Sequence, residues 1–293
     1  MRSLLFVPGD SPKKLEKAKA SGADALILDL EDSVSGDRKG EARATTLAFL
    51  KEFGPHARRP RLFVRVNGLS TGLTDDDLEV VAGRPDGIML PKAEGGSAVV
   101  HLDAKLAAHE ALHGLPDGHV RIVALTTETA KALFLAGTYA AASARLIGLT
   151  WGAEDLSAEL GAETNRDPEG RFLDPYRLAR SLCLAAAASA EVQAIDTVYV
   201  DFRNSAGLRR ETEEARRDGF TAKIAIHPGQ VDIINAVFTP TAEAIAKAKA
   251  VVAAFAADAS AGVVGLDGVM YDRPHLRRAE QLLARAKAAG LDG

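Results

Sequence analysis

Acidic side chains follow several short apolar segments of this 293-residue chain. The acids in such positions are Asp29, Glu31, Asp32, Glu128, Glu154 and Asp155. Carboxylates gathered in one place repel one another, and a hard divalent cation with oxygen ligands, such as Mg²⁺, is the usual compensation. Each acid could instead stabilise the N-terminus of the helix that follows it. Because several segments repeat the pattern, we favour a magnesium site over a set of independent helix caps.

Arg65 ends one of these apolar segments, after Leu62–Val64, and is the only cation that the pattern places among the acids. Arginine is rarely buried without a partner, so Arg65 needs an anion. Its planar fork could bind a substrate carboxylate or stabilise an enolate oxygen. A structural ion pair with Glu31, Asp32 or Glu128 is the alternative.

Two further places could bind ligands. Ser11 and Pro12 predict a helix start, and Lys13 and Lys14 in its first turn oppose the helix dipole. The phosphate of a nucleotide-like cofactor would explain these lysines, although a solvated surface is the simpler interpretation. His227 follows the last apolar segment, and we interpret it as a hydrogen-bonded structural residue. No second histidine lies at metal-ligand spacing from His227, and the sequence has no G-x-S-x-G, so we expect neither a zinc hydrolase built on His227 nor a serine nucleophile.

The apolar segments are the elements that must position these residues. There are eight of them, at 3–7, 25–30, 62–66, 87–90, 121–125, 145–149, 197–200 and 222–226. Stretches of helical composition lie between them, at 11–21, 39–52, 97–113, 129–142 and 173–190. Continuous apolar runs are typical of buried parallel strands, and their alternation with helices indicates βα units.

Eight βα units predict a (β/α)₈ TIM barrel, in which the C-terminal ends of the strands would bring the acids together. An open doubly wound sheet is the alternative, but no G-x-G-x-x-G follows the first segment. We expect the barrel to cover residues 1–230. Residues 231–293 would form a C-terminal helical extension of the same structural domain, with helices at 241–257 and 274–289, a small-residue connector at 258–265 and a turn at Asp267–Gly268.

Composition limits the partners and the compartment. The content is 47% hydrophobic and 26% charged, and the net charge of −4 gives no electrostatic reason to expect nucleic acid or a membrane surface as a partner. Small molecules are therefore the expected partners. The single cysteine, Cys183, excludes an internal disulfide and any site with several cysteine ligands. The apolar start is too short for a signal peptide, and no run approaches the ~20 residues of a membrane span, so we expect a cytoplasmic protein.

Nine segments, in this order and spacing, resemble the citrate lyase beta-subunit-like family, part of the HpcH/HpaI aldolase and malyl-coenzyme A lyase superfamily. They are Arg2–Gly9, Leu28–Val34, Phe63–Asn67, Met89–Lys92, Glu128–Thr129, Gly152–Leu156, Asp201–Arg203, Lys223–Pro228 and Asp267–Pro274. Each segment alone is weak, but their order and spacing are specific, and they span nearly the whole chain.

The resemblance implies a role for each candidate residue. Glu128 and Asp155 would be the ligands of Mg²⁺, and Arg65 would bind the 2-oxo acid and stabilise the enolate. Backbone amides at Ala153, Glu154 and Asp155 would contribute to substrate binding where negative charge develops.

The resemblance also gives the C-terminal extension a purpose. Asp272 matches the acid that related lyases bring, on a C-terminal lid, to the active site of a neighbouring subunit, where it would act as the base. The small connector Ala259–Gly262 would allow the last helix to leave its own barrel. Such enzymes are homotrimers or dimers of trimers.

The implied activity is cleavage of a 3-hydroxyacyl-coenzyme A thioester, malyl- or citramalyl-coenzyme A, to an acyl-coenzyme A and a 2-oxo acid. Coenzyme A would then be part of the substrate, and Mg²⁺ the cofactor. Alternatives are thioesterase or malate-synthase-like activity on the same esters, a citryl-acyl carrier protein lyase subunit, and a class II oxo-acid aldolase that uses no coenzyme A. A barrel that binds without turnover would lack one of the acids Glu128, Asp155 and Asp272, and all three are present.

Overall fold

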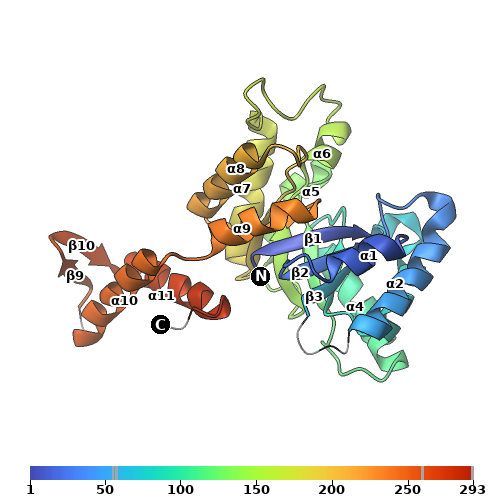
Figure 1. Cartoon of the computed structure of the whole chain (residues 1–293), viewed down its shortest axis with the longest axis horizontal. Coiled ribbons are helices and arrows are strands. Elements are labelled where there is room, and N and C mark those ends of the chain that lie inside the picture. The colour runs from blue at the N-terminus through green and yellow to red at the C-terminus, as the bar shows by residue number, and fades with distance from the viewer. Residues whose placement is uncertain (55, 57–58, 259–260, 292–293) are drawn as a thin grey trace. The chain divides into compact units, whose positions relative to one another are not determined.

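The computed structural model describes residues 1–54, 56, 59–258 and 261–291. The chain divides into two compact units, Met1–Asn235 and Ala236–Gly293, each described here by itself (Figure 1). None of the described helices combines the length and the apolar character needed to cross a bilayer.

The first unit is a closed barrel of eight parallel strands, paired in chain order. The strands are β1 (Ser3–Pro8), β2 (Ala25–Asp29), β3 (Arg61–Arg65), β4 (Gly87–Leu90), β5 (Arg121–Leu125), β6 (Leu146–Thr150), β7 (Gln193–Asp196) and β8 (Ala222–Ala225). The barrel closes because β1 pairs with β2 on one side and with β8 on the other. The predicted (β/α)₈ barrel is therefore confirmed.

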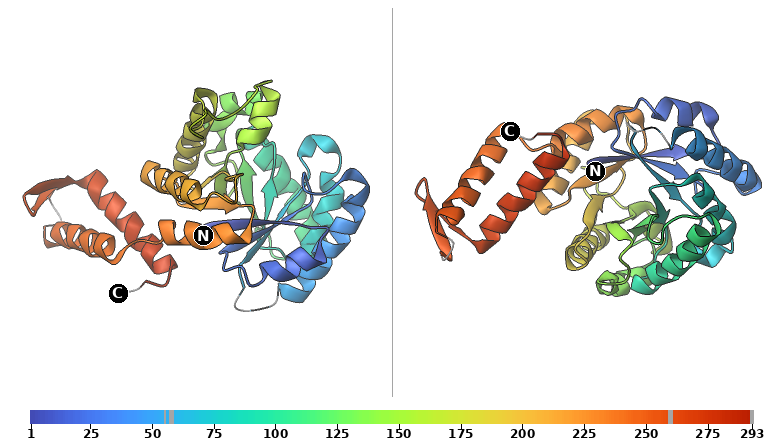
Figure 2. Two further views of the ribbon diagram at one scale, coloured as in Figure 1. Left: turned by 45° about the horizontal axis from the view of Figure 1, so that its top comes forward. Right: turned by 90° about the horizontal axis from the view of Figure 1, so that it is seen from below.

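Helices surround these strands (Figure 2). They are α1 (Pro12–Ala18), α2 (Lys39–Phe53), α3 (Thr74–Leu78), α4 (Gly96–Leu112), α5 (Ala130–Leu135), α6 (Ala153–Glu159), α7 (Asp174–Ser189), α8 (Ser205–Asp218) and α9 (Val231–Phe238). Short 3₁₀ helices occupy Gly36–Arg38, Leu69–Thr71, Glu79–Gly83, Ala136–Tyr139 and Pro228–Gln230.

The barrel interior is filled by apolar side chains from most of the strands. The fully or almost fully buried members are Leu4, Ala25, Ile27, Phe63, Met89, Val123, Leu125, Ile195, Ala222 and Ile224. Burial of a side chain as large as Phe63 stabilises the fold by about 1.5–3 kcal/mol. A Cβ at Gly87 would lie 2.6 Å from the ring of Phe63. Glycine at position 87 is therefore needed for this packing.

The predicted seventh strand, 197–200, is wrong by four residues, since β7 is Gln193–Asp196. This strand begins with Gln193 and ends with Asp196, so it is not a continuous apolar run. Asp196 is nevertheless only 1% exposed. Its carboxylate accepts hydrogen bonds from Lys223 Nζ at 2.6 Å and from Trp151 Nε1 at 2.9 Å. A buried acid with such partners is tolerated in the barrel wall.

The second unit contains the helices α10 (Ala242–Ala257) and α11 (Arg273–Ala288) and a hairpin of the strands β9 (Val263–Leu266) and β10 (Val269–Asp272). The two predicted helices and the turn at Asp267–Gly268 are present, and both turn residues have positive φ, as a tight hairpin requires. The predicted connector 258–265 is wrong from Val263 onward, because the strand β9 begins there. Residues 259–260 of that connector lie outside the described residues.

Candidate active site

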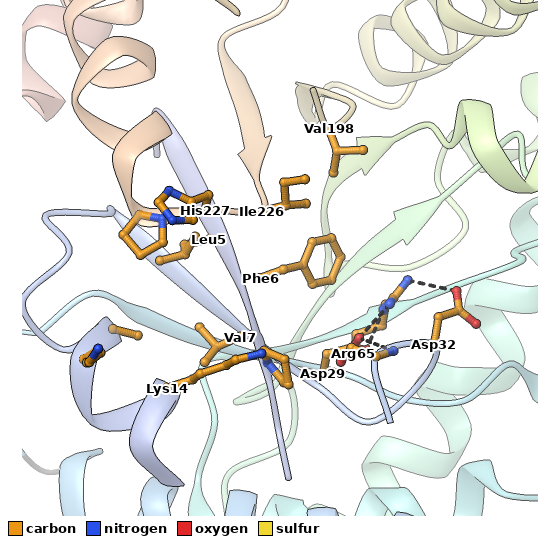
Figure 3. A pocket seen from close by; sticks show the side chains of 15 residues that line it. Leu5, Phe6, Val7, Lys14, Asp29, Asp32, Arg65, Val198, Ile226 and His227 are labelled. Carbon is orange, nitrogen blue, oxygen red and sulfur yellow. Dashed lines mark hydrogen bonds and ion pairs between the residues drawn. The ribbon is translucent and has the colours of Figure 1, made fainter. Parts of the chain in front are cut away.

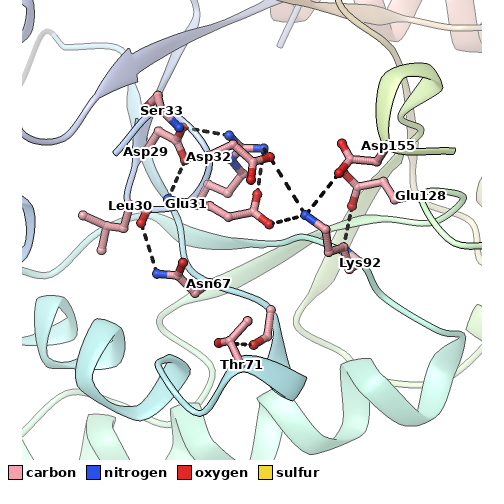
Figure 4. Close-up of polar contacts among 12 residues, drawn as sticks. Asp29, Leu30, Glu31, Asp32, Ser33, Asn67, Thr71, Lys92, Glu128 and Asp155 are labelled. Atoms are coloured by element: carbon pink, nitrogen blue, oxygen red, sulfur yellow. Dashed lines mark hydrogen bonds and ion pairs between the residues drawn. The ribbon is translucent and has the colours of Figure 1, made fainter. Parts of the chain in front are cut away.

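Charged side chains from five consecutive strand ends meet at the C-terminal edge of the barrel, as expected for parallel strands. Asp29 and Arg65 are the last residues of β2 and β3, and Lys92, Glu128 and Asp155 follow β4, β5 and β6. We call the set that meets there the mouth cluster (Figure 4). It consists of Asp29, Glu31, Asp32, Arg65, Lys92, Glu128 and Asp155.

Arg65 is held by a bidentate ion pair that sequence reasoning missed. Its Nε and Nη2 each donate to a carboxylate oxygen of Asp29 at 2.7 Å. Nη1 faces Glu31 at 2.8 Å and Asp32 at 3.6 Å, so two of the three partners considered from the sequence are present. Burial alone would lower the pKa of Arg65, but these acids raise it above its ordinary value, and the guanidinium stays charged.

The contacts around Arg65 fix its orientation. Phe6 lies against the guanidinium, with the ring centroid 4.6 Å from Cζ. Asp29 also accepts hydrogen bonds from the backbone amides of Glu31 at 3.0 Å and Ser33 at 3.1 Å. Burial would raise the pKa of Asp29, yet Arg65 holds it below its usual range. One edge of the guanidinium is thus occupied by Asp29, and Nη1 remains directed toward the other acids.

Lys92 corrects the expectation that Arg65 is the only cation among the acids. Its Nζ lies between two acids of the mouth cluster, 2.6 Å from Glu31 and 3.2 Å from Asp155 (Figure 4). Its position in the sequence could have indicated this role, because Lys92 follows the strand β4 just as the acids follow their own strands. Burial would lower the pKa of Lys92, but the neighbouring carboxylates raise it.

Glu128 is the most deeply buried acid near Lys92, with 3% of its surface exposed. The backbone amide of Lys92, whose φ is +49°, donates to Glu128 Oε2 at 2.5 Å. Burial raises the pKa of Glu128 to about 8, and the negative charge of Asp155 adds to that rise. A Cβ at Gly152 would lie 2.8 Å from Glu128 Cγ, so only glycine leaves room for this side chain.

Glu128 and Asp155 fit a magnesium ion. Within the described ranges, no group of three or more histidine, cysteine or acidic side chains is arranged to hold a metal. Two carboxylates are nevertheless enough for Mg²⁺, which completes its octahedron with water and substrate oxygens. A buried carboxyl with a pKa near 8 is the kind of group that a divalent cation would keep ionised.

Replacing Lys92 should change the magnesium affinity. Lys92→Met removes the ammonium beside Asp155 but keeps the backbone amide that binds Glu128. We expect about tenfold tighter Mg²⁺ binding by calorimetry, because one positive charge no longer competes for the carboxylates. Lys131→Met is the matched control, since Lys131 is 70% exposed and pairs with Glu94. An unchanged Mg²⁺ affinity in Lys92→Met would contradict a metal site at these acids.

A cavity of about 730 Å³ opens beside the mouth cluster (Figure 3). Its charged lining includes Arg65, Asp29 and Asp32 and also Lys14 and Lys17 from α1. Its apolar lining includes Leu5, Phe6, Val7, Val198 and Ile226. A cavity of this size with few polar groups is typical of a binding site for a small molecule.

His227 also lines this cavity. Its Nδ1 accepts a hydrogen bond from the Gly229 amide at 3.1 Å, and its ring stacks on Phe202 with centroids 5.1 Å apart. These contacts agree with the interpretation of His227 as a hydrogen-bonded structural residue.

The remaining candidates lie in α6 and in the second unit. Ala153 is buried at the start of α6, which no side chain caps, and Glu154 accepts a hydrogen bond from Asn165 at 2.9 Å. Asp272 caps α11 together with His275. The hydrogen bond from His275 lowers the pKa of Asp272, whose side chain is 38% exposed.

The chain is similar to several known proteins along most of its length. A family model described as HpcH/HpaI aldolase/citrate lyase matches residues 2–228. Citrate lyase subunit beta of Escherichia coli K12 is 38% identical over 293 residues, covering 99% of this chain and 94% of that protein. A (3S)-malyl-CoA thioesterase of Cereibacter sphaeroides is 39% identical, covering 98% of this chain and 95% of that protein. The crystal structure of the CitE protein of Mycobacterium tuberculosis in complex with magnesium, acetoacetate and coenzyme A is 35% identical, with a TM-score of 0.78 and 98% of each chain covered.

Proposed function

The chain belongs to the HpcH/HpaI aldolase/citrate lyase family, and on that premise we propose that it is a magnesium-dependent carbon–carbon lyase. Its substrate would be a 3-hydroxyacyl-coenzyme A thioester of the malyl or citramalyl type, cleaved to an acyl-coenzyme A and a 2-oxo acid. The observation that supports this reaction best is the mouth cluster, where the acids Glu128 and Asp155 lie with Lys92 and Arg65 near a cavity of ligand size.

Glu128 and Asp155 are the residues that we propose as the Mg²⁺ ligands. When bound, the ion would polarise the carbonyl group of the 2-oxo acid as a Lewis acid. The protein contributes the buried carboxylate of Glu128, and the Lys92 amide orients it. The magnesium complex of the similar CitE protein supports the choice of Mg²⁺ as the ion.

Arg65 would bind the carboxylate of the oxo acid and stabilise the oxygen of the enolate. Asp29 fixes the guanidinium at Nε and Nη2, so that Nη1 keeps one orientation without further ordering cost. Arg65 lines the cavity, where a substrate could reach it. The amides at Ala153, Glu154 and Asp155 would add hydrogen-bond donors for the same developing charge.

Arg65→Lys should lower kcat/KM for the thioester at least about a hundredfold, because a point-charge ammonium cannot keep the bidentate pair with Asp29 and also present a fixed donor to the substrate. Steady-state kinetics measures the effect. Arg61→Lys is the matched control, since Arg61 is exposed at the opposite end of the same strand. If Arg65→Lys retains near-normal kcat/KM, Arg65 serves only as a structural ion-pair residue.

Lys14 and Lys17 would hold phosphate groups of the coenzyme. Both side chains line the cavity, and α1, to which they belong, has no acid in its first turn. The apolar lining formed by Leu5, Val7 and Val198 leaves room for the uncharged part of the thioester.

Asp272 would be the base that removes the proton next to the thioester carbonyl in the bond-forming direction, a role that accelerates such reactions by about 10²–10⁴. We propose that it acts in the active site of a neighbouring subunit of a homotrimer or dimer of trimers. Its partner His275 lowers its pKa in the exposed state, and transfer into a water-poor site would raise it toward the range of an effective base.

Hydrolysis of the same thioester is the second candidate, because the chain is 39% identical to a (3S)-malyl-CoA thioesterase. Incubation with malyl- and citramalyl-coenzyme A and Mg²⁺, followed by mass spectrometry, distinguishes the two. We expect acetyl-coenzyme A together with glyoxylate or pyruvate. Free coenzyme A with an intact hydroxy acid would show hydrolysis, and no turnover of either ester would contradict the proposal.

A further inference from the structure

A second cavity, of about 460 Å³, lies on the outside of the barrel between α7, α8 and the loop that precedes α7. Its lining is strongly charged. The charged members are Arg166, Arg171, Arg177, Arg180, Arg210, Arg217, Glu211, Glu214 and Asp218. Arginines outnumber acids two to one, in a chain whose overall charge is negative.

Two of the three acids are already bound to cations. Glu211 contacts Arg166 at 2.7 Å and also Lys223 at 3.0 Å, and Lys223 is completely buried behind it. Asp218 contacts Arg180 Nη1 at 2.6 Å. Glu211 and Asp218 are therefore engaged, and Glu214, which forms no ion pair within the described residues, is the one lining acid left to offset the remaining arginines of the cavity.

Three arginines of the cavity have no such partner. Within the part of the chain that the structure describes, no carboxylate lies within ion-pair distance of Arg177, Arg210 or Arg217. Arg210 and Arg217 are seven residues apart on α8, and so project from one face of the helix. Like charges gathered at one cavity repel one another unless an anion lies between them.

Arg180 supplies an independent sign of a missing partner. Its side chain is only 14% exposed, and its Nη2 is buried without a hydrogen-bond partner, whereas Nη1 pairs with Asp218. A buried unsatisfied donor on a charged group is costly, and a small movement of the Arg180 side chain toward an anion in the cavity would satisfy it. Burial would lower the pKa of Arg180, but Asp196 and Asp218 raise it, so the donor stays charged.

We propose that this cavity is a second binding site, for a small phosphate-bearing anion held by Arg177, Arg180, Arg210 and Arg217. Planar guanidinium forks match phosphate oxygens, and several forks around one cavity suit a ligand with more than one negative charge. Phe172 and Tyr199 complete one side, where the Arg166 guanidinium lies 3.7 Å from the centroid of Phe172. This site is distinct from the cavity at the mouth cluster, with which it shares no lining residue.

Calorimetry with inorganic pyrophosphate, on the full chain at low ionic strength with EDTA present, tests the proposal. We expect saturable binding that Arg210→Gln/Arg217→Gln weakens at least about tenfold, because two guanidinium contacts are lost. Arg209→Gln/Arg216→Gln is the matched control, since it removes the same charge from the same helix at residues that do not line the cavity. The control should alter the affinity less than about twofold.

Four results would overturn the site. Pyrophosphate at millimolar concentration could give no saturable heat with the wild-type chain. Both double variants could lose affinity equally, which would show only nonspecific attraction to a basic helix. Binding could also disappear in Lys14→Gln/Lys17→Gln, which would place the ligand in the cavity at the barrel mouth. A change of molecular mass in Arg210→Gln/Arg217→Gln, without pyrophosphate binding to the wild type, would assign the face to a subunit contact instead.

Discussion

Glu128→Gln is expected to reduce magnesium-dependent turnover by on the order of 10³-fold, because a neutral amide cannot replace a carboxylate that binds a divalent cation. The variant keeps an oxygen that can accept the Lys92 amide, so the side chain should stay in place. Calorimetry should show that the affinity for Mg²⁺ falls together with turnover. Unchanged Mg²⁺ affinity would exclude Glu128 as a ligand.

The thermal stability of Glu128→Gln separates loss of the metal from loss of the fold. Because burial raises the pKa of Glu128 to about 8, ionising it costs folding free energy. This cost grows as pH rises from the unfolded value, about 4.3, and is fully present above the folded one. Without metal, the Tm of Glu128→Gln should therefore be equal to or higher than that of the wild type near pH 9. The difference in Tm between the two proteins should be smaller near pH 5.

Glu94→Gln is the matched control for this substitution. Glu94 also follows β4, but its carboxylate pairs with the exposed Lys131 at 2.7 Å. Turnover and Mg²⁺ affinity should both stay near the wild-type values. A comparable loss in the control would show that any change of charge near the mouth lowers the activity.

Mixing Asp272→Asn chains with Glu128→Gln chains should restore activity that neither variant has alone. If the base acts across a subunit interface, some sites combine an intact barrel from one chain with an intact lid from the other. Random reassembly of equal amounts should give about a quarter of the wild-type sites, since each partner is intact half of the time. Activity after denaturation and joint refolding measures this fraction.

Asp272→Asn separates the role of the carboxylate charge from the role of the side chain as the cap of α11. Asparagine caps helices as well as aspartate does, so Asp272→Asn should leave α11 intact. Asp267→Asn is the matched control in the same unit, because Asp267 lies in the β9–β10 turn with positive φ, which asparagine tolerates. Refolded mixtures that exchange subunits but recover no activity would place the action of Asp272 within its own chain or exclude it.

Patterns of apolar residues sufficed to predict most of the barrel. Continuous runs such as 25–30 and 121–125 match β2 and β5 because buried parallel strands need no polar face. β7 was misplaced because Asp196 obtains its partners from distant parts of the chain, namely Lys223 in β8 and Trp151 just after β6. Pairing of that kind depends on the tertiary structure and leaves no local pattern.

The site shows the same difference between features with a local sequence pattern and features that depend on tertiary contacts. The acids were found because each follows an apolar run, and the barrel brings those ends together. Lys92 was given no role, and Asp29 was grouped with the other acids but not paired with Arg65, because both roles depend on contacts made across the mouth. Asp29 is the last residue of the apolar strand β2. Nothing in the local sequence pattern indicates that it pairs with Arg65.

The closure of the barrel affects where the chain is prone to self-association. Each of its eight strands has a neighbour on both sides, so the first unit presents no unpaired strand edge. The hairpin β9–β10 is a sheet of two strands and has two outer edges, and Val263, Val269 and Met270 on it are each more than half exposed. Open edges with apolar side chains are templates for aggregation. Solubility during synthesis and storage should therefore depend on how the hairpin is covered rather than on the barrel.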